Sequence, residues 1–543
     1  MKRDPVNAER DHVIAVDIGT GSARAGVFDG AGALLARADH PIAMHRPAEG
    51  RAEQDSEDIW RAACTAVRAA RMAARVGADR IGAIGFDATC SLVVRDCEGQ
   101  PLCISEAQGE EEAAGPRWDT IVWLDHRAAE EAEACTATGH PVMVASGTVM
   151  SPEMQMPKLM WLKRHLPARW ARAGLIFDLA DFMTWRATGS AARSRCTLAA
   201  KWHYGPAAGS GWDRDFLAAI GLEDLEERCG LSAGVLPVGA SIGSLTPEAA
   251  ADLGLDPETR VAAGLIDAYA GALGVLGGQA GDVGALGRQM ALIGGTSACL
   301  VAFSATARPA RGLWGPYHEA VFPGLFLIEG GQSAAGGLLD HIVRSHGGGM
   351  LPDAAGHRRI IDRIRALRDA EGAAFAVRLH VLPDFHGNRS PHATPDALGV
   401  ISGLPLDSSF DALCRLYWRT LVSLALGIRQ ILDLMAKAGY PAETLHVTGG
   451  QVRNSLLVEL YADVTGCRVV VPRTPDAVLL GTAMGASVAA GLHPDLQAAG
   501  VAMQPEGETI LPSPERAAHY ERDYAAFLLL QRQRAELEAL ISA

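Results

Sequence analysis

The chain has 543 residues, of which 48% are hydrophobic and 21% charged, and its formal net charge is −14. This length exceeds what a single hydrophobic core usually serves, so we expect two or more domains in a globular protein of ordinary composition. The acidic balance, without a lysine- and arginine-rich segment, argues against nucleic-acid binding.

Cysteine usage and hydropathy predict a cytoplasmic protein that does not bind membranes. The ten cysteines are scattered and form no CxxC pair, so we expect neither a zinc site nor disulfides. The first twelve residues contain no apolar core, which argues against a signal peptide. Residues 289–307 are uncharged, but the internal Gly294-Gly295-Thr296-Ser297 predicts two strands around a turn rather than a membrane span.

Residues 13–29 predict a β-hairpin with a glycine- and hydroxyl-rich tip. An apolar run from Val13 to Val16 ends at Asp17, a turn covers 18–22, and a second strand covers 25–28. Glycines let backbone amides approach a phosphate closely, and the carboxylate at the strand end suits Mg²⁺. The alternative is an ordinary hairpin whose aspartate binds its own turn.

Two common phosphate-binding motifs are excluded. No GxxxxGK[ST] sequence occurs, so the chain is not a P-loop enzyme. The pair Gly19 and Gly21 lacks the third glycine of a dinucleotide fingerprint, because Arg24 stands at that place, and a strand pattern follows where that motif needs a helix.

Polar residues follow two further predicted strands. The buried-type strand 81–86 leads into the small and hydroxyl residues 87–91, which predict either a ligand-pocket wall or a plain tight turn. The strand 121–124 leads into Asp125-His126-Arg127, which either binds a polar ligand or caps the helix 128–135, and we favour the cap.

Asp267 is the best catalytic candidate of the chain. It is the only charge between Val261 and Ala280, in an apolar segment with flanking glycines. Burying an isolated carboxylate is costly, so Asp267 either caps the helix that begins at Ala268 or takes part in chemistry. By contrast, the lone Lys201 follows small residues and its pattern alone favours a surface position.

A second strand–turn–strand unit, 289–303, repeats the layout of the first hairpin. Two such hairpins can hold phosphates from opposite sides. The glycine-rich stretch 329–337 and the turn 448–454 also follow predicted strands. The helix 410–438 carries an apolar stripe that we assign to the core.

In this order, the motifs resemble those of the FGGY carbohydrate kinases, of the actin-like and hexokinase ATPase superfamily. The resemblance covers about residues 12–495 and rests on DIGTGSAR at 17–24, GxxD ending at Asp267, GGTS at 294–297 and TGGQVRNS at 448–455. The segments 85–91, 123–127 and 383–391 look most like the D-ribulokinase-type pentulose kinases. The segment 196–201 also resembles the L-ribulokinases, in which a lysine at this place contacts the ketopentose.

The resemblance implies residue roles. Asp267 would be the general base and Asp17 would position Mg²⁺. The residues that would surround the sugar are Thr89, Cys90, Lys201, Asp267 and Glu329. The residues that would bind ATP are Thr20, Gly21, Ser22, Arg24, Thr296, Gly336, Gly450, Gln451 and Asn454. Thr89-Cys90 replaces the arginine–glutamate pair of glycerol kinases, so glycerol is a poor substrate for this sequence.

The resemblance also implies the fold, an α/β protein with two RNase H-like domains of the actin and hexokinase type around a central cleft. The expected limits are 12–278 for a sugar-binding domain, 279–495 for a nucleotide-binding domain and 496–543 for a helical tail. The expected reaction is ATP- and Mg²⁺-dependent phosphorylation of a ketopentose, D-ribulose above others.

Other functions stay open from the sequence. They are phosphorylation of another pentulose or pentitol, such as L-ribulose, xylulose or ribitol, and a non-catalytic role as an actin-like ATPase or sugar sensor. The expected partners are the sugar and ATP, and the sequence leaves a homodimer open.

Overall fold

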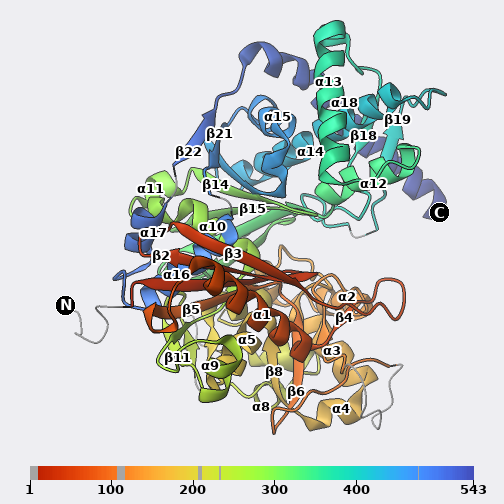
Figure 1. Cartoon of the computed structure of the whole chain (residues 1–543). Coiled ribbons are helices and arrows are strands. Elements are labelled where there is room, and N and C mark those ends of the chain that lie inside the picture. The colour runs from red at the N-terminus through yellow and green to blue at the C-terminus, as the bar shows by residue number, and fades with distance from the viewer. Residues whose placement is uncertain are drawn as a thin grey trace. The chain divides into compact units, whose positions relative to one another are not determined.

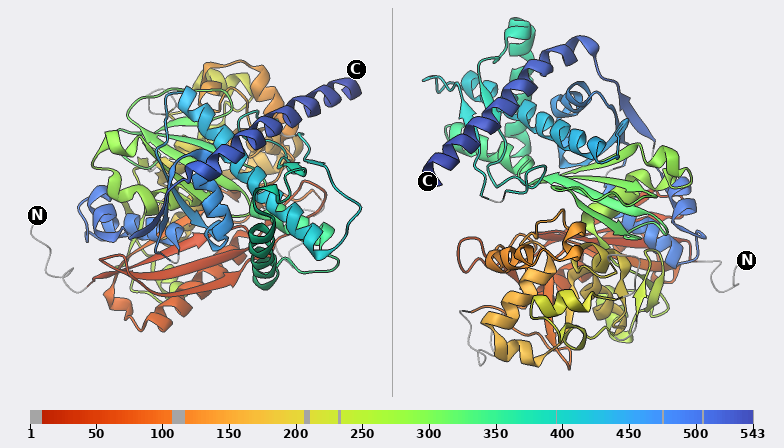
Figure 2. Two further views of the ribbon diagram at one scale, coloured as in Figure 1. Left: turned by 90° about the horizontal axis from the view of Figure 1, so that it is seen from above. Right: turned by 180° about the vertical axis from the view of Figure 1, so that it is seen from behind.

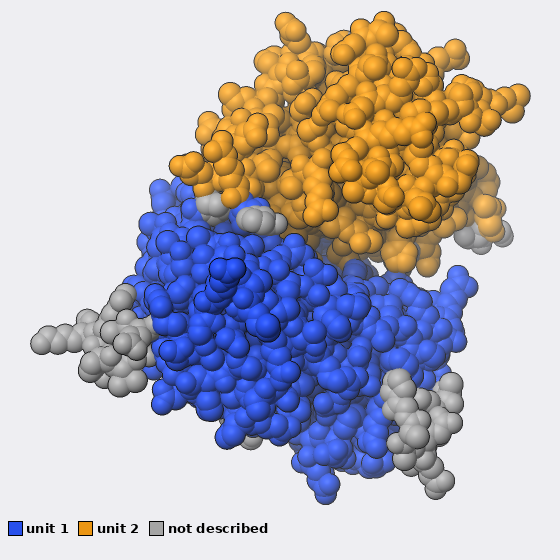
Figure 3. All heavy atoms as spheres, in the orientation of Figure 1, with its two compact units in different colours: residues 1–286, 303–328, 474–505 blue, residues 287–302, 329–473, 506–543 orange. Residues whose placement is uncertain are grey.

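The computed structural model describes residues 10–106, 117–205, 211–231, 234–394, 396–474, 476–504 and 506–542. The chain forms two compact units, each assembled from separate stretches (Figure 3). The first unit comprises 1–286, 303–328 and 474–505, and the second comprises 287–302, 329–473 and 506–543. The domain limits inferred from the sequence stay a prediction.

Within the described ranges, no helix is long and apolar enough to cross a bilayer. The uncharged stretch 289–307 forms the strands β14 (Gln289–Gly294) and β15 (Ala298–Ser304), as predicted. The expected lack of a signal peptide concerns residues 1–12, of which 1–9 lie outside the described residues.

The main sheet of the first unit has the strand order β11-β12-β5-β1-β2-β3, and β13 also pairs with β5 (Figure 1). Its strands are β1 (His12–Ile18), β2 (Ser22–Asp29), β3 (Leu34–Pro41), β5 (Ile81–Ala88), β11 (Ser241–Ser244), β12 (Arg260–Ala262) and β13 (Leu265–Ile266). β1 is antiparallel to β2 and parallel to β5. Apart from His12, all residues of β1 and β5 are buried, because helices cover both faces.

The helices on one face of this sheet are α1 (Ser56–Ala74), α5 (Leu179–Thr188) and α9 (Pro247–Leu253), and those on the other are α10 (Asp267–Leu276) and α16 (Ala477–Ala489). α1 begins after Asp55, whose carboxylate accepts hydrogen bonds from the amides of Glu57 and Asp58. α16 lies far along the chain from β1 but packs against β1 and β5, so it completes the core on this face of the sheet.

The first unit also holds a smaller sheet in the order β4-β7-β6-β8 and a strand pair β9-β10. Their bounds are β4 (Glu53–Gln54), β6 (Leu92–Asp96), β7 (Thr120–Ile121), β8 (Ala173–Asp178), β9 (Arg193–Ser194) and β10 (Val235–Leu236). The remaining elements of this unit are α2 (Ala129–Ala137), α3 (Gln155–His165), α4 (Pro167–Arg172), α6 (Arg195–Lys201), α7 (Arg214–Ala219), α8 (Leu225–Arg228), α11 (Val283–Leu286), β16 (Trp314–His318) and α17 (Leu496–Met503).

The second unit is built on strands in the order β17-β15-β14-β20-β21-β22. Its further strands are β17 (Phe326–Gln332), β20 (Thr444–Gly449), β21 (Arg468–Pro472), β22 (Gly507–Ile510) and the hairpin of β18 (His380–Leu382) and β19 (Val400–Ser402). Its helices are α12 (Gly336–His346), α13 (Ala354–Glu371), α14 (Phe410–Lys437), α15 (Ser455–Thr465) and α18 (Pro514–Ser542). α18 packs across α14, α15 and β18 (Figure 2).

The two units share one strand plan. In each, a hairpin at the sheet centre (β1-β2 or β14-β15) is followed by a third strand beyond it, and a later strand (β5 or β20) runs parallel to the first. Such mixed sheets are those of the two RNase H-like domains that the resemblance implied, and the predicted likeness of the two hairpins is confirmed. The buried stripe of α14 is confirmed as well.

Close contact between α10 and α16 gives a test of this packing. A Cβ atom added to Gly481 would lie 1.8 Å from the carbonyl oxygen of Ala270, whereas one added to Gly485 would lie 3.8 Å from its nearest neighbour. We expect Gly481→Ala to lower stability by about 1–3 kcal/mol through overpacking. Gly485→Ala, on the same helix, should be neutral or stabilising by up to about 1 kcal/mol.

Thermal unfolding of the two purified variants measures this difference. Equal melting temperatures for Gly481→Ala and Gly485→Ala would contradict the described contact between the helices.

Candidate active site

Three carboxylates lie at one edge of the main sheet of the first unit. Asp17 and Asp87 are direct neighbours across the parallel strands β1 and β5. β13 pairs with β5 so that Ile266 lies opposite Ala88, which places Asp267 just beyond the end of the same edge. Carboxyl ends of neighbouring parallel strands in α/β sheets are common ligand sites.

The two strand-borne carboxylates are buried. Asp17 is 1% exposed and Asp87 is fully buried. Burial raises the pKa of Asp17 to about 7, an effect that Arg24 opposes and the charge of Asp267 reinforces. Burial and the charge of Asp17 hold the pKa of Asp87 well above its ordinary range, although Thr482 donates a hydrogen bond of 2.5 Å to it. The fold therefore places two carboxyl groups where burial disfavours their ionised form.

Few cations balance these carboxylates. Arg24 Nη2 lies 2.6 Å from Asp17 Oδ2, and Arg24 Nη1 lies 3.8 Å from Asp476. Arg37 lies 3.9 Å from Asp476. Two guanidinium groups thus face four carboxylates, counting Asp87 and Asp267.

The residues present fit a hard divalent cation. Neither oxygen of Asp17, nor Oδ1 of Asp87, receives a hydrogen bond of good geometry, although Arg24 is in ionic contact with Asp17. Mg²⁺ prefers oxygen ligands and is usually bound by one or two carboxylates together with water and phosphate oxygens. In the described part of the chain no group of three or more His, Cys, Asp or Glu side chains could hold a metal without such help.

Side chains from other segments hold the tip of the β1-β2 hairpin, and the end of the tip is exposed. Trp123 Nε1 donates to Thr20 Oγ1 at 3.0 Å, and Gln54 Nε2 donates to the carbonyl of Thr20 at 2.9 Å. The Gly19 amide donates to the Ser22 carbonyl across the turn. Gly21 is exposed with nothing within 4 Å of a Cβ position, so the tip leaves room for a phosphate next to Arg24.

The predicted sugar residues of the first unit come together. Thr89 and Cys90 directly follow β5, whose last residue, Ala88, is paired with Ile266, the residue before Asp267. Lys201, the last residue of α6, is 5% exposed. Its Nζ lies 5.1 Å from the Trp314 ring and 5.8 Å from the ring of Tyr269, two residues after Asp267. The surface alternative for Lys201 is wrong, because two aromatic rings cover the ammonium group.

Cys90 offers its backbone rather than a reactive thiol. Burial raises the pKa of its thiol to about 12, so the thiolate is not accessible at neutral pH. Its carbonyl accepts a hydrogen bond of 3.0 Å from Gln155 Nε2. The remaining predicted sugar residue, Glu329, is buried in β17 of the second unit.

Several neighbours of this region were not identified from the sequence. Asp87 follows an apolar run, as Asp17 does, and this shared pattern could have identified Asp87 from the sequence. Lys158 is fully buried, with Nζ 3.3 Å from the carbonyls of Val122 and Trp123. Trp314 comes from a segment far from Lys201 in the sequence, and no local signal links the two.

The trio Asp125-His126-Arg127 does not cap a helix, so that prediction is wrong. α2 begins after Ala128, without a side-chain cap. Asp125 Oδ2 instead accepts from the Ala52 amide at 2.6 Å, and Arg127 forms buried ion pairs with Asp125 and Glu53. A buried arginine between two carboxylates gains several charge-assisted hydrogen bonds, which a cap would not provide.

In the second unit, glycines bring the predicted nucleotide residues together. Gly294 and Gly449 are paired across the parallel strands β14 and β20, and a Cβ on Gly449 would lie 2.4 Å from the carbonyl of Gly294. The Gly336 amide, at the start of α12, donates to the Gly295 carbonyl next to Thr296. The turn after β14, the start of α12 and the turn after β20 therefore meet.

Two amide side chains in this cluster have unused donors. Gln451 Oε1 accepts from Tyr461 at 2.6 Å, but its Nε2 has no partner. Asn454 caps α15 through its oxygen, and its Nδ2 makes no hydrogen bond of good geometry, although the side chain interacts with the Tyr417 hydroxyl. Both residues are more than nine-tenths buried. Buried amide donors are normally satisfied by a protein group, by water or by a ligand, so these two donors are available to an acceptor that enters the cluster.

Two family models match the chain. Residues 12–274 match the N-terminal domain of the FGGY family of carbohydrate kinases, and residues 290–490 match its C-terminal domain. Relatives from Danio rerio and Homo sapiens, described as FGGY carbohydrate kinase domain-containing proteins, are 42% and 40% identical over 98% of this chain and over 99% and 98% of their own length. A D-ribulokinase of Saccharomyces cerevisiae is 35% identical over 88% of this chain and 72% of its own.

Solved structures agree. The xylulose kinase from Rhodospirillum rubrum matches with a TM-score of 0.77 and 25% identity, covering 97% of this chain and 99% of that chain. Plasmodium falciparum glycerol kinase with ADP matches in fold, with a TM-score of 0.73 and 14% identity over 96% of this chain and 98% of that chain.

Buried charge at Asp17 predicts a pH-dependent loss of stability. The pKa of Asp17 in the folded protein, about 7, lies above the ordinary 3.8, so the folded state binds this proton more tightly than the unfolded state. This contribution therefore falls as pH rises from about 4 to about 7 and is fully lost above that range. Without nucleotide or metal, we expect Asp17→Asn to melt higher than wild type at pH 8, with a smaller difference at pH 5.

Thermal unfolding at the two pH values measures the effect, with the exposed Asp215→Asn as a control that should not shift. A lower melting temperature of Asp17→Asn at pH 8 would show that Asp17 stabilises the fold.

Proposed function

Because the chain belongs to the FGGY family of carbohydrate kinases, we propose that it transfers the γ-phosphoryl group of ATP to a hydroxyl of a ketopentose, with D-ribulose as the preferred substrate. The alignment with a D-ribulokinase over most of the chain is the observation that carries the choice of D-ribulose. The kinase chemistry itself is supported by the carboxylates at the ends of β1, β5 and β13.

Asp267 is the proposed general base. It is the first residue of α10, and its Oδ1 accepts a hydrogen bond of 2.7 Å from the Ala268 amide. The helix N-terminus and this amide stabilise and orient the carboxylate. In that position Asp267 would accept the proton of the sugar hydroxyl as the hydroxyl attacks phosphorus.

Asp17 is the proposed residue for Mg²⁺, with Asp87 beside it. When bound with ATP, Mg²⁺ neutralises charge on the phosphate oxygens. The hydrogen bond from Thr482 fixes the Asp87 carboxylate next to Asp17. Thr20, Gly21, Ser22 and Arg24 are the proposed phosphate-binding residues of the first unit, since they form the open hairpin tip and its cation.

The second unit is the proposed main site of the nucleotide. Thr296, Gly336, Gly450, Gln451 and Asn454 are the residues of this proposal. The unused donor of Gln451 supports it, because a nucleotide is rich in acceptor atoms. Transfer then requires that the γ-phosphate held by these groups reaches the hydroxyl beside Asp267.

Lys201, Thr89, Cys90 and Glu329 are the proposed sugar-binding residues. The Lys201 ammonium has fixed donors in a largely dry setting, which is suited to reading a sugar hydroxyl or carbonyl oxygen. Xylulose is one competing substrate, since a xylulose kinase shares the fold at 25% identity.

We expect Asp267→Asn to lower kcat by about 10²–10⁴, because loss of a positioned base removes this much of the rate. ADP affinity should change by less than about threefold, a shift of less than about 0.7 kcal/mol in binding free energy. Single-turnover kinetics and calorimetry measure the two quantities, with Asp215→Asn as a matched control. Wild-type turnover by Asp267→Asn would remove this residue from the mechanism.

Substrate identity is tested by coupled ADP release with D-ribulose, L-ribulose, D-xylulose, ribitol and glycerol. We expect the highest kcat/KM for D-ribulose. An equal or higher value for another sugar would reject D-ribulose while leaving the kinase assignment intact. Turnover of none of them would favour a sensor or an assembly protein.

Lys201→Met should raise KM for the ketopentose at least tenfold, because a hydrogen bond from a charged group contributes about 1.5–3 kcal/mol. KM for ATP should hardly change. Lys437→Met, at the exposed end of α14, is the control. Unchanged sugar kinetics in Lys201→Met would remove the lysine from the sugar site.

A further inference from the structure

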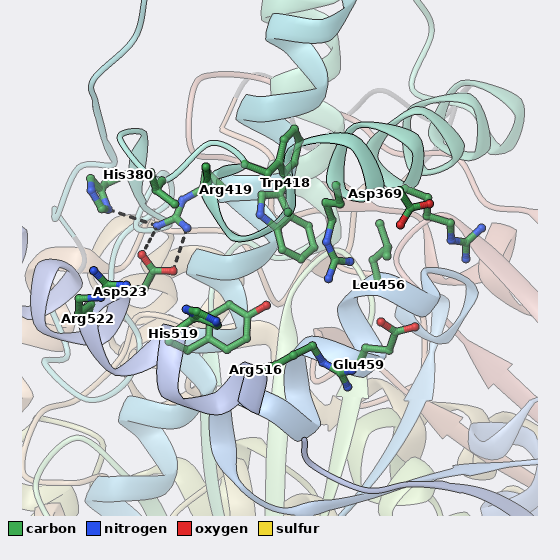
Figure 4. A pocket seen from close by; sticks show the side chains of 17 residues that line it. Asp369, His380, Trp418, Arg419, Leu456, Glu459, Arg516, His519, Arg522 and Asp523 are labelled. Carbon is green, nitrogen blue, oxygen red and sulfur yellow. Dashed lines mark hydrogen bonds and ion pairs between the residues drawn. The ribbon is translucent and has the colours of Figure 1, made fainter. Parts of the chain in front are cut away.

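A pocket of about 1010 Å³ lies within the second unit, and its lining contains none of the proposed nucleotide residues (Figure 4). Four helices supply its walls. Arg368 comes from α13, Trp418 from α14, Glu459 from α15, and His519 and Arg522 from α18. Figure 4 shows Trp418, His519 and Glu459 around one opening.

The walls are rich in cations. Five arginines line the pocket (Arg365, Arg368, Arg419, Arg516 and Arg522), against three carboxylates (Asp369, Glu459 and Asp523). This local excess of positive charge stands out in a chain of net charge −14. A concave surface on which arginines outnumber carboxylates attracts anionic ligands.

Two of the arginines are occupied by strong ion pairs, and Arg365 pairs with Asp362 at 3.3 Å on its own helix. Arg419 makes a bidentate pair with Asp523, with distances of 2.7 and 2.9 Å. Arg516 pairs with Asp463 at 2.5 and 3.2 Å. These pairs hold α18 against α14 and α15 and thereby build the pocket.

Two other arginines have no carboxylate partner among the residues that the structure describes. Arg522 is exposed on α18. Arg368 is half-buried, with its guanidinium carbon 4.3 Å from the centroid of the Trp418 ring. Stacking on an aromatic face fixes the guanidinium plane while leaving its N–H groups available, an arrangement suited to a phosphate.

The carboxylates refine the ligand class. Asp369 and Glu459 lie in the same pocket and would repel a bare inorganic anion. They would accept hydrogen bonds from hydroxyl groups instead. A ligand that carries both a phosphate and several hydroxyls satisfies the arginines and the carboxylates together.

One wall of the pocket leads to the proposed nucleotide site. Glu459 and Leu456 of α15 line the pocket, and Asn454 caps the same helix. Arg365, from the pocket wall on α13, donates a hydrogen bond of 2.5 Å to Ser455, the first residue of α15. A ligand that shifts α13 or α15 would therefore move the amide of Asn454.

We propose that this pocket binds a phosphorylated sugar or polyol and that its occupancy changes nucleotide affinity through α15. Binding of this ligand does not depend on the proposed function. The change in nucleotide affinity does, because it rests on the assignment of Asn454 to the nucleotide site.

The binding part is tested by calorimetry on the full chain, without nucleotide, with ribose 5-phosphate, ribose and inorganic phosphate as probes. Ribose 5-phosphate should bind at least tenfold more tightly than either of the others. Arg368→Ala and Arg522→Ala should each weaken it about tenfold, as expected for loss of one charge-assisted hydrogen bond. Arg358→Ala, an exposed arginine on α13 outside the pocket, should bind as wild type does.

Binding that is equal for ribose and ribose 5-phosphate, or that neither pocket variant weakens, would overturn the site. Arg522 makes no described contact, so Arg522→Ala keeps the test valid if Arg368→Ala destabilises the fold. Binding at the catalytic site is separated by Asp267→Asn and Lys201→Met, which should leave the pocket affinity unchanged.

The coupling is tested by ADP titration with and without saturating ribose 5-phosphate. We expect ADP affinity to change at least threefold in wild type and not in Arg522→Ala, and ribose 5-phosphate affinity should change by the same factor when ADP is bound. An unchanged ADP affinity would overturn the coupling. Failure of ADP to bind at all would instead reject the nucleotide assignment and leave the pocket standing.

Discussion

Burial of Asp17 beside Asp87 is the constraint on which the first unit depends. Parallel pairing of β1 and β5 forces two carboxylates into direct opposition with little solvent. Such an arrangement disfavours the empty folded state, and helices on both faces of the sheet must stabilise it. A fold selected for stability alone would place apolar residues here, as it does in the rest of both strands. Binding of a cation together with phosphates would offset this cost in folding free energy.

The repeated strand plan explains how two chemically different sites arise from one architecture. In both units a hairpin at the sheet centre and a parallel neighbour bring two turns to the same edge. In the first unit that edge carries carboxylates and hydroxyls. In the second it carries glycines and amides, since a Cβ at Gly294, Gly336 or Gly449 would strike a neighbouring chain atom. The two units share the backbone arrangement, and the side chains at this edge make them chemically different.

Local features of the fold could be predicted from the sequence. Apolar runs, turn glycines and isolated charges located both hairpins, α14 and the segment of Asp267. The sequence was insufficient for contacts that depend on strand order or on distant segments. Asp87 gains its meaning only from pairing with Asp17, and Lys201 is covered by Trp314 from far along the chain. The trio at Asp125 was misread because a charged turn after a strand looks the same whether it is exposed or buried against Glu53.

Charge distribution limits how this acidic chain can hold a polyanion. In the first unit, Arg24 is already in contact with Asp17 and near Asp476, so its charge is largely neutralised before phosphate arrives. Four carboxylates around it would repel ATP unless a divalent cation came with the phosphates. The donors of Gln451 and Asn454 carry no charge and need no such compensation. On the proposed assignment, the uncharged donors of the second unit can bind a nucleotide without a metal, whereas the carboxylate-rich edge of the first unit requires a divalent cation to accept phosphates.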